Sequence, residues 1–310
     1  MSSFKDLRIV DNFYQTSLFF PMPTVLIGTL CDDGKTSLGP YSLVQPYYVA
    51  GKDYYAMLLN CRNSSNTAQH ILKTGKCTIN FVKDDRKTFK EVVRLGWPGD
   101  TPEEKMKDCK FTLEEGLMAA EHPDEKFPMV VADAFQAIEC TWMRELDGAD
   151  RDQPGQLEGY EPPYHDFNGI TSKFGATFIL RVDKILMKEK YYNAIINGVK
   201  SRDFPHAPVD YGYRDSKNFW YIRHSRAIPE LLPMRQTTVS SVMYAAERID
   251  PEVKFTEEAC ARLVKVPRIF LPTALKGCVE WAKQNGVTLI TEEHMDIIND
   301  KRAKEKNKKA

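Results

Sequence analysis

The chain of 310 residues carries 43 basic and 43 acidic side chains, so its formal net charge at pH 7 is zero, and 42% of its residues are hydrophobic. This balance predicts a globular protein with a sizeable core. It also excludes the strong positive field that attracts nucleic acid or an anionic membrane, so we expect neither as a partner.

We expect no targeting or membrane segment in this chain. Its first residues lack a basic stretch followed by an apolar one, and no later segment approaches the roughly 20 apolar residues of a membrane helix. Its seven cysteines are scattered without a Cys-x-x-Cys pair, which is typical of reduced thiols in the cytosol. We therefore expect a cytoplasmic protein. The spacing of the six histidines predicts no metal site.

The first strand signals form a hairpin. Residues 24–30 are an apolar, β-branched run, and the Asp33-Gly34 step that follows suits the positive φ of a tight turn. We predict a returning strand over residues 36–47. Within it, Gly39 and Pro40 are expected to interrupt the ladder and leave backbone groups for a ligand.

A third strand, over residues 54–60, leads into the sharpest local signal. A short helix is predicted over residues 68–73, with Ser64 or Ser65 as its N-cap and Gly75 at its end. A helix start has unpaired N–H groups and a positive dipole end, which together suit a phosphate. The candidate phosphate-site residues are Arg62, Asn63, Ser64, Ser65, Asn66 and Thr67. An ordinary N-cap beside a solvated arginine is the alternative that this pattern leaves open.

The succession of these elements resembles the flavin reductase-like proteins, whose FMN-binding split barrel includes the flavoredoxins. The resemblance covers residues 15–225, and its weight rests on residues 24–82. It implies a mainly β fold with α, an antiparallel Greek-key split barrel that binds FMN. It also implies that the segment from Arg62 to Thr67 holds the FMN phosphate. The residues expected along the isoalloxazine ring are Tyr41, Ser42, Leu43 and Val44. Family members often have Asn where this chain has His70.

The next part of the chain mixes helices and strands. Apolar residues at helical spacings predict a helical insertion over residues 86–127. Strands are expected over residues 130–143 and 174–188. Glu139 lies within the first of these strands. For its side chain a hydrogen-bonded structural role is favoured over a role as general base.

Helices replace strands toward the C-terminus. Three are expected, over residues 256–264, 272–285 and 291–301 or beyond, after a linker with one further helix over residues 239–248. We place the boundary near residue 250. This gives a flavin reductase-like split-barrel domain over residues 1–250 and a small helical domain over residues 251–310. The helical part resembles the small C-terminal domain of a light-independent protochlorophyllide reductase subunit, which implies a compact appendage that contacts a partner or substrate.

The main resemblance implies an FMN-dependent oxidoreductase with NADH or NADPH as co-substrate. It also implies a homodimer, and a redox partner protein is conceivable for the helical domain. No catalytic side chain is assigned, because the flavin carries the chemistry. Two alternatives stay open. One is a flavoredoxin-type electron carrier without direct NAD(P)H turnover, and the other is a barrel that has lost its flavin.

Overall fold

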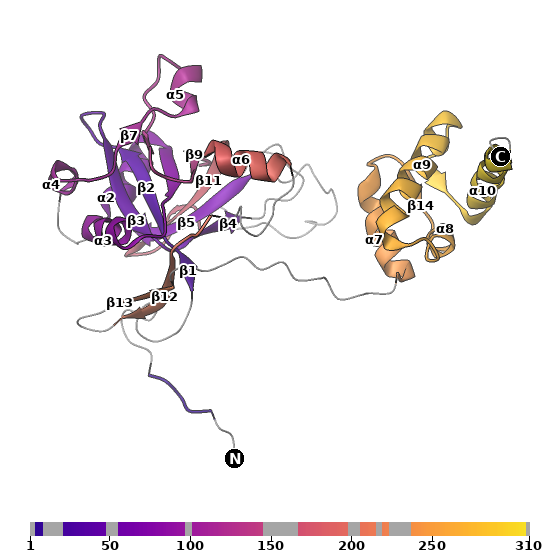
Figure 1. Ribbon diagram of the computed structural model, residues 1–310, viewed down its shortest axis with the longest axis horizontal. Helices are drawn as coiled ribbons and strands as arrows, with labels where there is room; N and C mark the ends of the chain where they lie inside the picture. The colour runs from indigo at the N-terminus through magenta and orange to yellow at the C-terminus, as the bar shows by residue number, and fades with distance from the viewer. Residues whose placement is uncertain are drawn as a thin grey trace. The chain divides into compact units, whose positions relative to one another are not determined.

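The computed structural model describes residues 4–8, 21–47, 55–96, 101–144, 167–197, 205–214, 219–222 and 237–307 (Figure 1). The chain divides into two compact units, Met1–Pro229 and Glu230–Ala310.

The first unit is built on one antiparallel sheet, which has eight strands within the described residues. The strands are β2 (Val25–Leu30), β3 (Thr36–Tyr41), β4 (Val44–Tyr47), β5 (Ala56–Arg62), β6 (Lys76–Phe81), β9 (Gln136–Trp142), β10 (Gly169–Ile170) and β11 (Gly175–Met187). Their order is β3-β2-β6-β9-β11-β5-β4, with β10 attached to β11. Because neighbours in the sheet are mostly distant in sequence, the connections cross the sheet as in a Greek key.

The two edge strands of this sheet are consecutive in the chain. β3 and β4 stand at opposite ends of the strand order, yet only Ser42 and Leu43 separate them. The three Cα–Cα steps from Tyr41 to Val44 span at most about 11 Å, so the sheet must curl until its edges lie side by side. Among the described residues no ladder joins β3 to β4. The predicted antiparallel split barrel is thereby confirmed.

The prediction of a single returning strand over residues 36–47 was wrong in two respects. Gly39 and Pro40 do not interrupt the ladder, since they pair with Ile27 and Leu26 of β2. Proline is tolerated there because β3 is an edge strand, whose outward N–H positions need no partner. The strand breaks instead after Tyr41, where the chain passes from one edge to the other.

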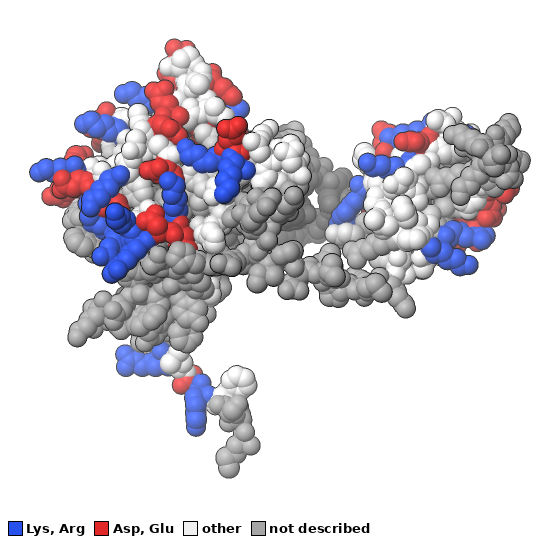
Figure 2. Space-filling view, viewed as in Figure 1, with Lys and Arg blue, Asp and Glu red and all other residues white. Residues whose placement is uncertain are grey.

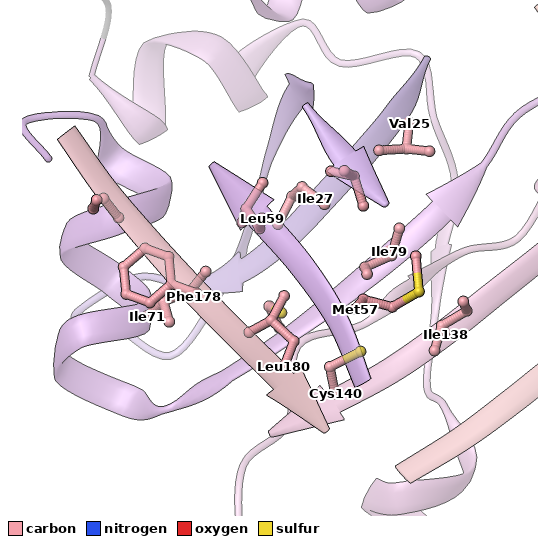
Figure 3. Close-up of a cluster of buried hydrophobic side chains, with 14 residues drawn as sticks. Val25, Ile27, Met57, Leu59, Ile71, Ile79, Ile138, Cys140, Phe178 and Leu180 are labelled. Atoms are coloured by element: carbon pink, nitrogen blue, oxygen red, sulfur yellow. The ribbon is translucent and has the colours of Figure 1, made fainter. Parts of the chain in front are cut away.

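The barrel encloses an apolar core to which a helix contributes. Helix α2 (Asn66–Thr74) follows β5 and places Ala68 and Ile71 against the inner face of the sheet (Figure 3). Phe178 of β11 is fully buried, and its ring meets that of Trp142 edge to face, with centroids 5.3 Å apart. Other core residues include Val25, Ile27, Val44, Met57, Leu59, Cys77, Ile79, Ile138, Cys140 and Leu180.

The predicted helical insertion covers the outer face of β2 and β3. Its elements are α3 (Arg86–Leu95), α4 (Pro102–Lys107), β7 (Leu113–Glu114), α5 (Leu117–Glu121) and β8 (Val130–Val131). Val92 and Leu95 of α3 pack with Leu26 and Leu38 in a second apolar cluster. With one face on the barrel core and the other under the insertion, every residue of β2 is buried.

Glu139 joins the insertion to the barrel, as its predicted structural role requires. Its carboxylate is only 2% exposed and accepts hydrogen bonds from the backbone N–H groups of Leu117 (2.9 Å) and Met118 (3.2 Å). Gly116 leaves room for it, because a Cβ at that position would lie 2.1 Å from a carboxylate oxygen. Burial raises the pKa of Glu139 above its usual value.

The first unit also contains a further helix and a second, smaller sheet. Helix α6 (Glu189–Ile196) follows β11 directly. A separate three-stranded sheet has the order β1-β12-β13 and consists of β1 (Met22–Pro23), β12 (Val209–Arg214) and β13 (Phe219–Ile222).

The second unit is helical, with one small ladder. Its elements are α7 (Val239–Ile249), β14 (Lys254–Phe255), α8 (Glu257–Arg262), η3 (Arg268–Phe270), α9 (Leu271–Gln284), β15 (Leu289–Ile290) and α10 (Glu292–Asn307). The helices expected from sequence are present. The parallel pairing of β14 with β15 was not anticipated, since strands of two residues carry no periodic signal.

Helix α7 belongs to the helical unit rather than to a linker. Its Val242 and Ala246 are buried with Leu275 and Cys278 of α9 in one apolar core. The division between the units therefore precedes α7, at Pro229, and not residue 250 as expected. The reason is that the apolar stripe of α7 is buried in the core of this unit, against α8, α9 and β14.

Two absences hold within the described parts of the chain. No helix there combines the length and the apolar character needed to cross a membrane. No group of three or more His, Cys, Asp or Glu side chains there could hold a metal ion.

The raised pKa of Glu139 predicts a pH dependence of stability. A carboxyl whose pKa is higher in the folded state stabilises the fold below its unfolded pKa, roughly 4.3. That contribution is lost as the pH rises through the folded pKa. Glu139→Gln keeps an acceptor oxygen but cannot ionise, so wild type should lose stability relative to this variant from about pH 4 upward. Urea unfolding at pH 4 to 8 measures the difference, and parallel pH profiles would contradict the assignment.

Candidate functional site

The end of β3 and the start of α2 meet, which brings together the two segments that the sequence singled out. The Tyr41 hydroxyl donates a hydrogen bond to Ser65 Oγ at 3.2 Å. Burial, with the neighbouring Cys61 thiol, raises the pKa of Tyr41 above its usual value, so the phenol is neutral and can donate. The barrel seam at residues 41–44 therefore lies beside the first turn of α2.

Ser65, one of the two serines predicted for this role, is the N-cap of α2. Its φ and ψ are −71° and 148°, and its Oγ accepts a hydrogen bond from the Ala68 N–H at 3.1 Å. The helix ends where expected, at Gly75, whose φ of 70° is left-handed and whose N–H donates to the Ile71 carbonyl. Ser65 satisfies one first-turn N–H, and a helix start has several such groups without an intrahelical partner.

Arg62 is the cation of this site. It is the last residue of β5, its side chain is exposed, and among the described residues its guanidinium forms no ion pair. Ser64, two residues later, is also exposed. An unpaired arginine, a hydroxyl and a positive helix end form the donor set that binds phosphate groups in proteins.

Asn63 has a structural task in the same loop. Its N–H donates to the Phe174 carbonyl at 3.0 Å and its side-chain amide to the Lys173 carbonyl at 3.0 Å. Its own carbonyl accepts from the Gln69 side chain at 2.7 Å. Asn63 therefore fastens the loop between β5 and α2 to the turn before β11, which leaves its amide committed to protein groups.

The turn before β11 is the part of the site that sequence reasoning missed. Phe174 is 71% exposed, and the Lys173 ammonium lies 5.2 Å from its ring centroid. This turn reaches the phosphate loop because Gly175 pairs with Arg62. That register depends on long-range strand pairing, so no local pattern could have indicated it.

The four predicted ring-contacting residues occupy different environments. Val44 is 5% exposed and its side chain belongs to the barrel core, so only its backbone can meet a ligand. The Leu43 carbonyl accepts the Asn60 N–H at 3.0 Å. Ser42, which follows Tyr41 in the chain, is partly buried. Ser42 thus has the side chain best suited to a polar contact at the seam.

Gly39 and Thr67 permit the close approach of α2 to β3. A Cβ on Gly39 would lie 2.9 Å from Thr67 Oγ1, which is too tight for any other residue without a shift. Thr67 is itself buried. The last predicted member of the phosphate loop, Asn66, is the first residue of the helix. Thr67 therefore lies against the strand, while Asn66 opens the helix.

His70, where the family often has Asn, faces the barrel wall. Its Nδ1 lies 2.9 Å from Thr29 Oγ1 of β2, and Thr74 Oγ1 donates to its backbone carbonyl at 2.8 Å. Burial lowers the pKa of His70 below its usual value, which favours the neutral ring. The side chain therefore helps to seat α2 on the sheet.

No protein-family model matches this chain, and no curated protein is similar to it in sequence. Solved structures with similar folds include a 2-nitrobenzoate 2-nitroreductase from Pseudomonas fluorescens, with 17% identity, TM-score 0.48, and coverage of 69% of this chain and 86% of that one. A flavoredoxin from Methanosarcina acetivorans has 14% identity and TM-score 0.48, with 77% and 100% covered. An FMN-binding protein from Thermus thermophilus has 13% identity and TM-score 0.47, with 74% and 100% covered.

The two neighbouring serines give a test of the cap. Ser65→Ala removes the acceptor for both the Ala68 N–H and the Tyr41 hydroxyl, so we expect a loss of about 1 kcal/mol in the free energy of unfolding. Ser64→Ala, at an exposed position without a capping role, should stay within about 0.5 kcal/mol of wild type. Urea denaturation of both variants measures the difference. Equal effects would show that Ser65 is not the cap.

Proposed function

We propose that this chain is an FMN-binding flavoprotein oxidoreductase whose cofactor phosphate binds at the start of α2. The observation that carries the proposal is the hydrogen bond between Tyr41 and Ser65. It places the barrel seam next to a capped helix start. Arg62, which forms no ion pair with any described residue, lies three positions before Ser65. The seam and the helix start are the two surfaces that a phosphate-bearing flat ligand requires.

The residues present fit FMN by the chemistry of their donors. Arg62, Ser64 and the first-turn N–H groups of α2 would hold the dianionic phosphate through charge-assisted hydrogen bonds. Asn63, Ser65, Asn66 and Thr67 would shape the loop around it. The ring edge would lie along the backbone of Ser42, Leu43 and Val44, with Tyr41 beneath the phosphate loop.

The bound flavin would supply hydride and single-electron transfer, and the chain would bind, orient and shield it. No side chain needs to act as an acid or base in such a reaction. This agrees with the placement of Glu139, the one acid that the sequence raised for that role. Its carboxylate is buried and committed to Leu117 and Met118.

We further propose a cytoplasmic homodimer that uses NADH or NADPH as co-substrate. The dimer and the co-substrate follow from the resemblance to flavin reductase-like proteins over residues 24–82. The balanced charge of the chain favours neither nucleic acid nor membrane as partner. In this proposal the helical unit docks a redox partner protein.

A flavoredoxin-type electron carrier is the second candidate. The sequence observation that favours it is the lack of a Gly-x-Gly-x-x-Gly dinucleotide motif. In such a carrier the flavin would exchange electrons with another protein without direct reaction with a nicotinamide. Both candidates share the same FMN site.

The FMN site is tested by titration of the apoprotein with FMN, followed by quenching of flavin fluorescence. We expect saturable binding that Arg62→Ala weakens about tenfold to a hundredfold, since a hydrogen bond to a charged group contributes about 1.5–3 kcal/mol. Arg86→Ala is the matched control, because Arg86 is exposed at the start of α3 in the same unit. It should change the Kd less than about twofold, because surface substitutions away from a site have small effects.

If the wild-type protein causes no saturable quenching of FMN fluorescence, the proposed function is refuted. Equal weakening by Arg62→Ala and Arg86→Ala would instead remove the phosphate from the start of α2.

Steady-state oxidation of NADH and NADPH separates the two candidates. An oxidoreductase should oxidise one of them with FMN bound, at a rate that depends on occupancy of the site. A carrier should bind FMN and show negligible oxidation. The Arg62→Ala variant should oxidise the nicotinamide more slowly than wild type at limiting FMN and at the wild-type rate at saturating FMN. That result would tie turnover to the FMN site.

A further inference from the structure

A cavity opens on the first unit, away from the proposed flavin site. It has a volume of about 760 Å³ and lies between the β2–β3 hairpin, helix α4 and the segment that leads into β8. Its apolar lining includes Met106, Leu113, Phe127 and Met129, and Cys31 lies at the hairpin side. The volume falls within the range of small-molecule sites, roughly 300–1,000 Å³.

The cavity is at the far end of α2 from the phosphate loop. Asp32, in the hairpin beside the cavity, forms an ion pair with Lys73 in the last turn of α2, at 2.6 Å. Ser65 caps the other end of this nine-residue helix. At 1.5 Å per residue the two ends are roughly 14 Å apart. A ligand in the cavity would therefore not occupy the phosphate site.

The floor of the cavity is held in place before any ligand binds. The Met129 N–H donates to Thr36 Oγ1 at 2.8 Å, and the Met129 carbonyl accepts from Thr78 Oγ1 at 3.2 Å. The Phe127 ring is fixed by the Lys76 ammonium, which lies 3.8 Å from its centroid. These contacts anchor the backbone of the segment to the barrel, while the Met129 side chain stays 39% exposed. Preorganised apolar surface of this kind lowers the entropic cost of binding.

Charged groups of both signs lie around the cavity. Asp33 pairs with Lys35 at 2.8 Å, and the Glu104 carboxylate accepts the Thr101 N–H at 2.8 Å. Glu103 and Lys107 stand one turn apart on α4, and Figure 2 shows acidic and basic side chains interspersed over this side of the unit. The lining thus presents both acidic and basic groups, Asp33, Glu103 and Glu104 with Lys35 and Lys107.

Cys31 adds an uncharged polar group. Burial, reinforced by nearby acids of which Asp33 contributes most, raises the pKa of its thiol to about 11. The thiol is therefore protonated at neutral pH, when it is a weak hydrogen-bond donor and a poor nucleophile.

We propose that this cavity is a binding site for an uncharged aromatic molecule of two to three rings. Phe127 offers a ring for edge or offset contact. Met106 and Met129 offer polarizable side chains that adapt to a flat ligand. The lining carries acidic and basic side chains together, so an organic ion of either sign would lose hydration and meet like charges as well as opposite ones.

The test uses the full chain and N-phenyl-1-naphthylamine, a neutral three-ring dye whose fluorescence rises in apolar surroundings. We expect saturable binding at one site that excess FMN leaves unchanged. Met129→Glu places a carboxylate in the lining and should weaken binding at least about tenfold. Ile185→Glu is the control, since Ile185 is 61% exposed on β11 and outside the cavity. It should leave binding unchanged.

Protection of Cys31 gives a second readout on the wild-type protein. The dye should slow alkylation of Cys31 by N-ethylmaleimide, followed by mass spectrometry, and leave that of Cys109 unchanged. Cys109 is likewise partly buried but lies outside the cavity lining. The proposal is overturned if the dye does not saturate, if FMN displaces it, if both glutamate variants bind alike, or if Cys31 is not protected.

Discussion

The structure of the first unit depends on the short link between β3 and β4. These strands are the two edges of the sheet, and only Ser42 and Leu43 separate them. A sheet whose edges are joined this closely cannot stay open, so it curls around an apolar core. The same link places the C-terminal end of strand β3 against α2, where the Tyr41 hydroxyl donates a hydrogen bond to Ser65. The link that closes the barrel therefore also brings the parts of the candidate site together.

Strand β2 is buried on both faces, and the two proposed sites of this unit lie toward different ends of helix α2. The inner face packs on the barrel core and the outer face under α3 and the residues around β8. Helix α2 packs Ala68 and Ile71 into the barrel core, and its two ends contact different parts of the unit. Its start, with Ser65, faces the seam and Arg62, whereas its last turn, with Lys73, meets the hairpin beside the apolar cavity.

The chemistry proposed for the chain asks little of its side chains. A flavoprotein needs a phosphate anchor, a wall along the ring and exclusion of water, while the cofactor transfers the electrons. The described residues supply an unpaired arginine, a capped helix start and a seam lined by backbone groups. The buried acid Glu139 does not face this site. It holds the helical insertion on the sheet, and burial rather than catalysis accounts for its raised pKa.

The sequence by itself determined the features that depend on residues close together in the chain. The hairpin at Gly34, the cap at Ser65, the stop at Gly75 and the C-terminal helices follow from local backbone preferences and short-range hydrogen bonds. Tertiary structure decided what depends on distant partners. It broke the predicted strand after Tyr41, committed Asn63 to the turn before β11, and drew α7 into the helical core. The physical reason is that strand register and shared apolar faces are set by pairing across long sequence separations, which no local pattern records.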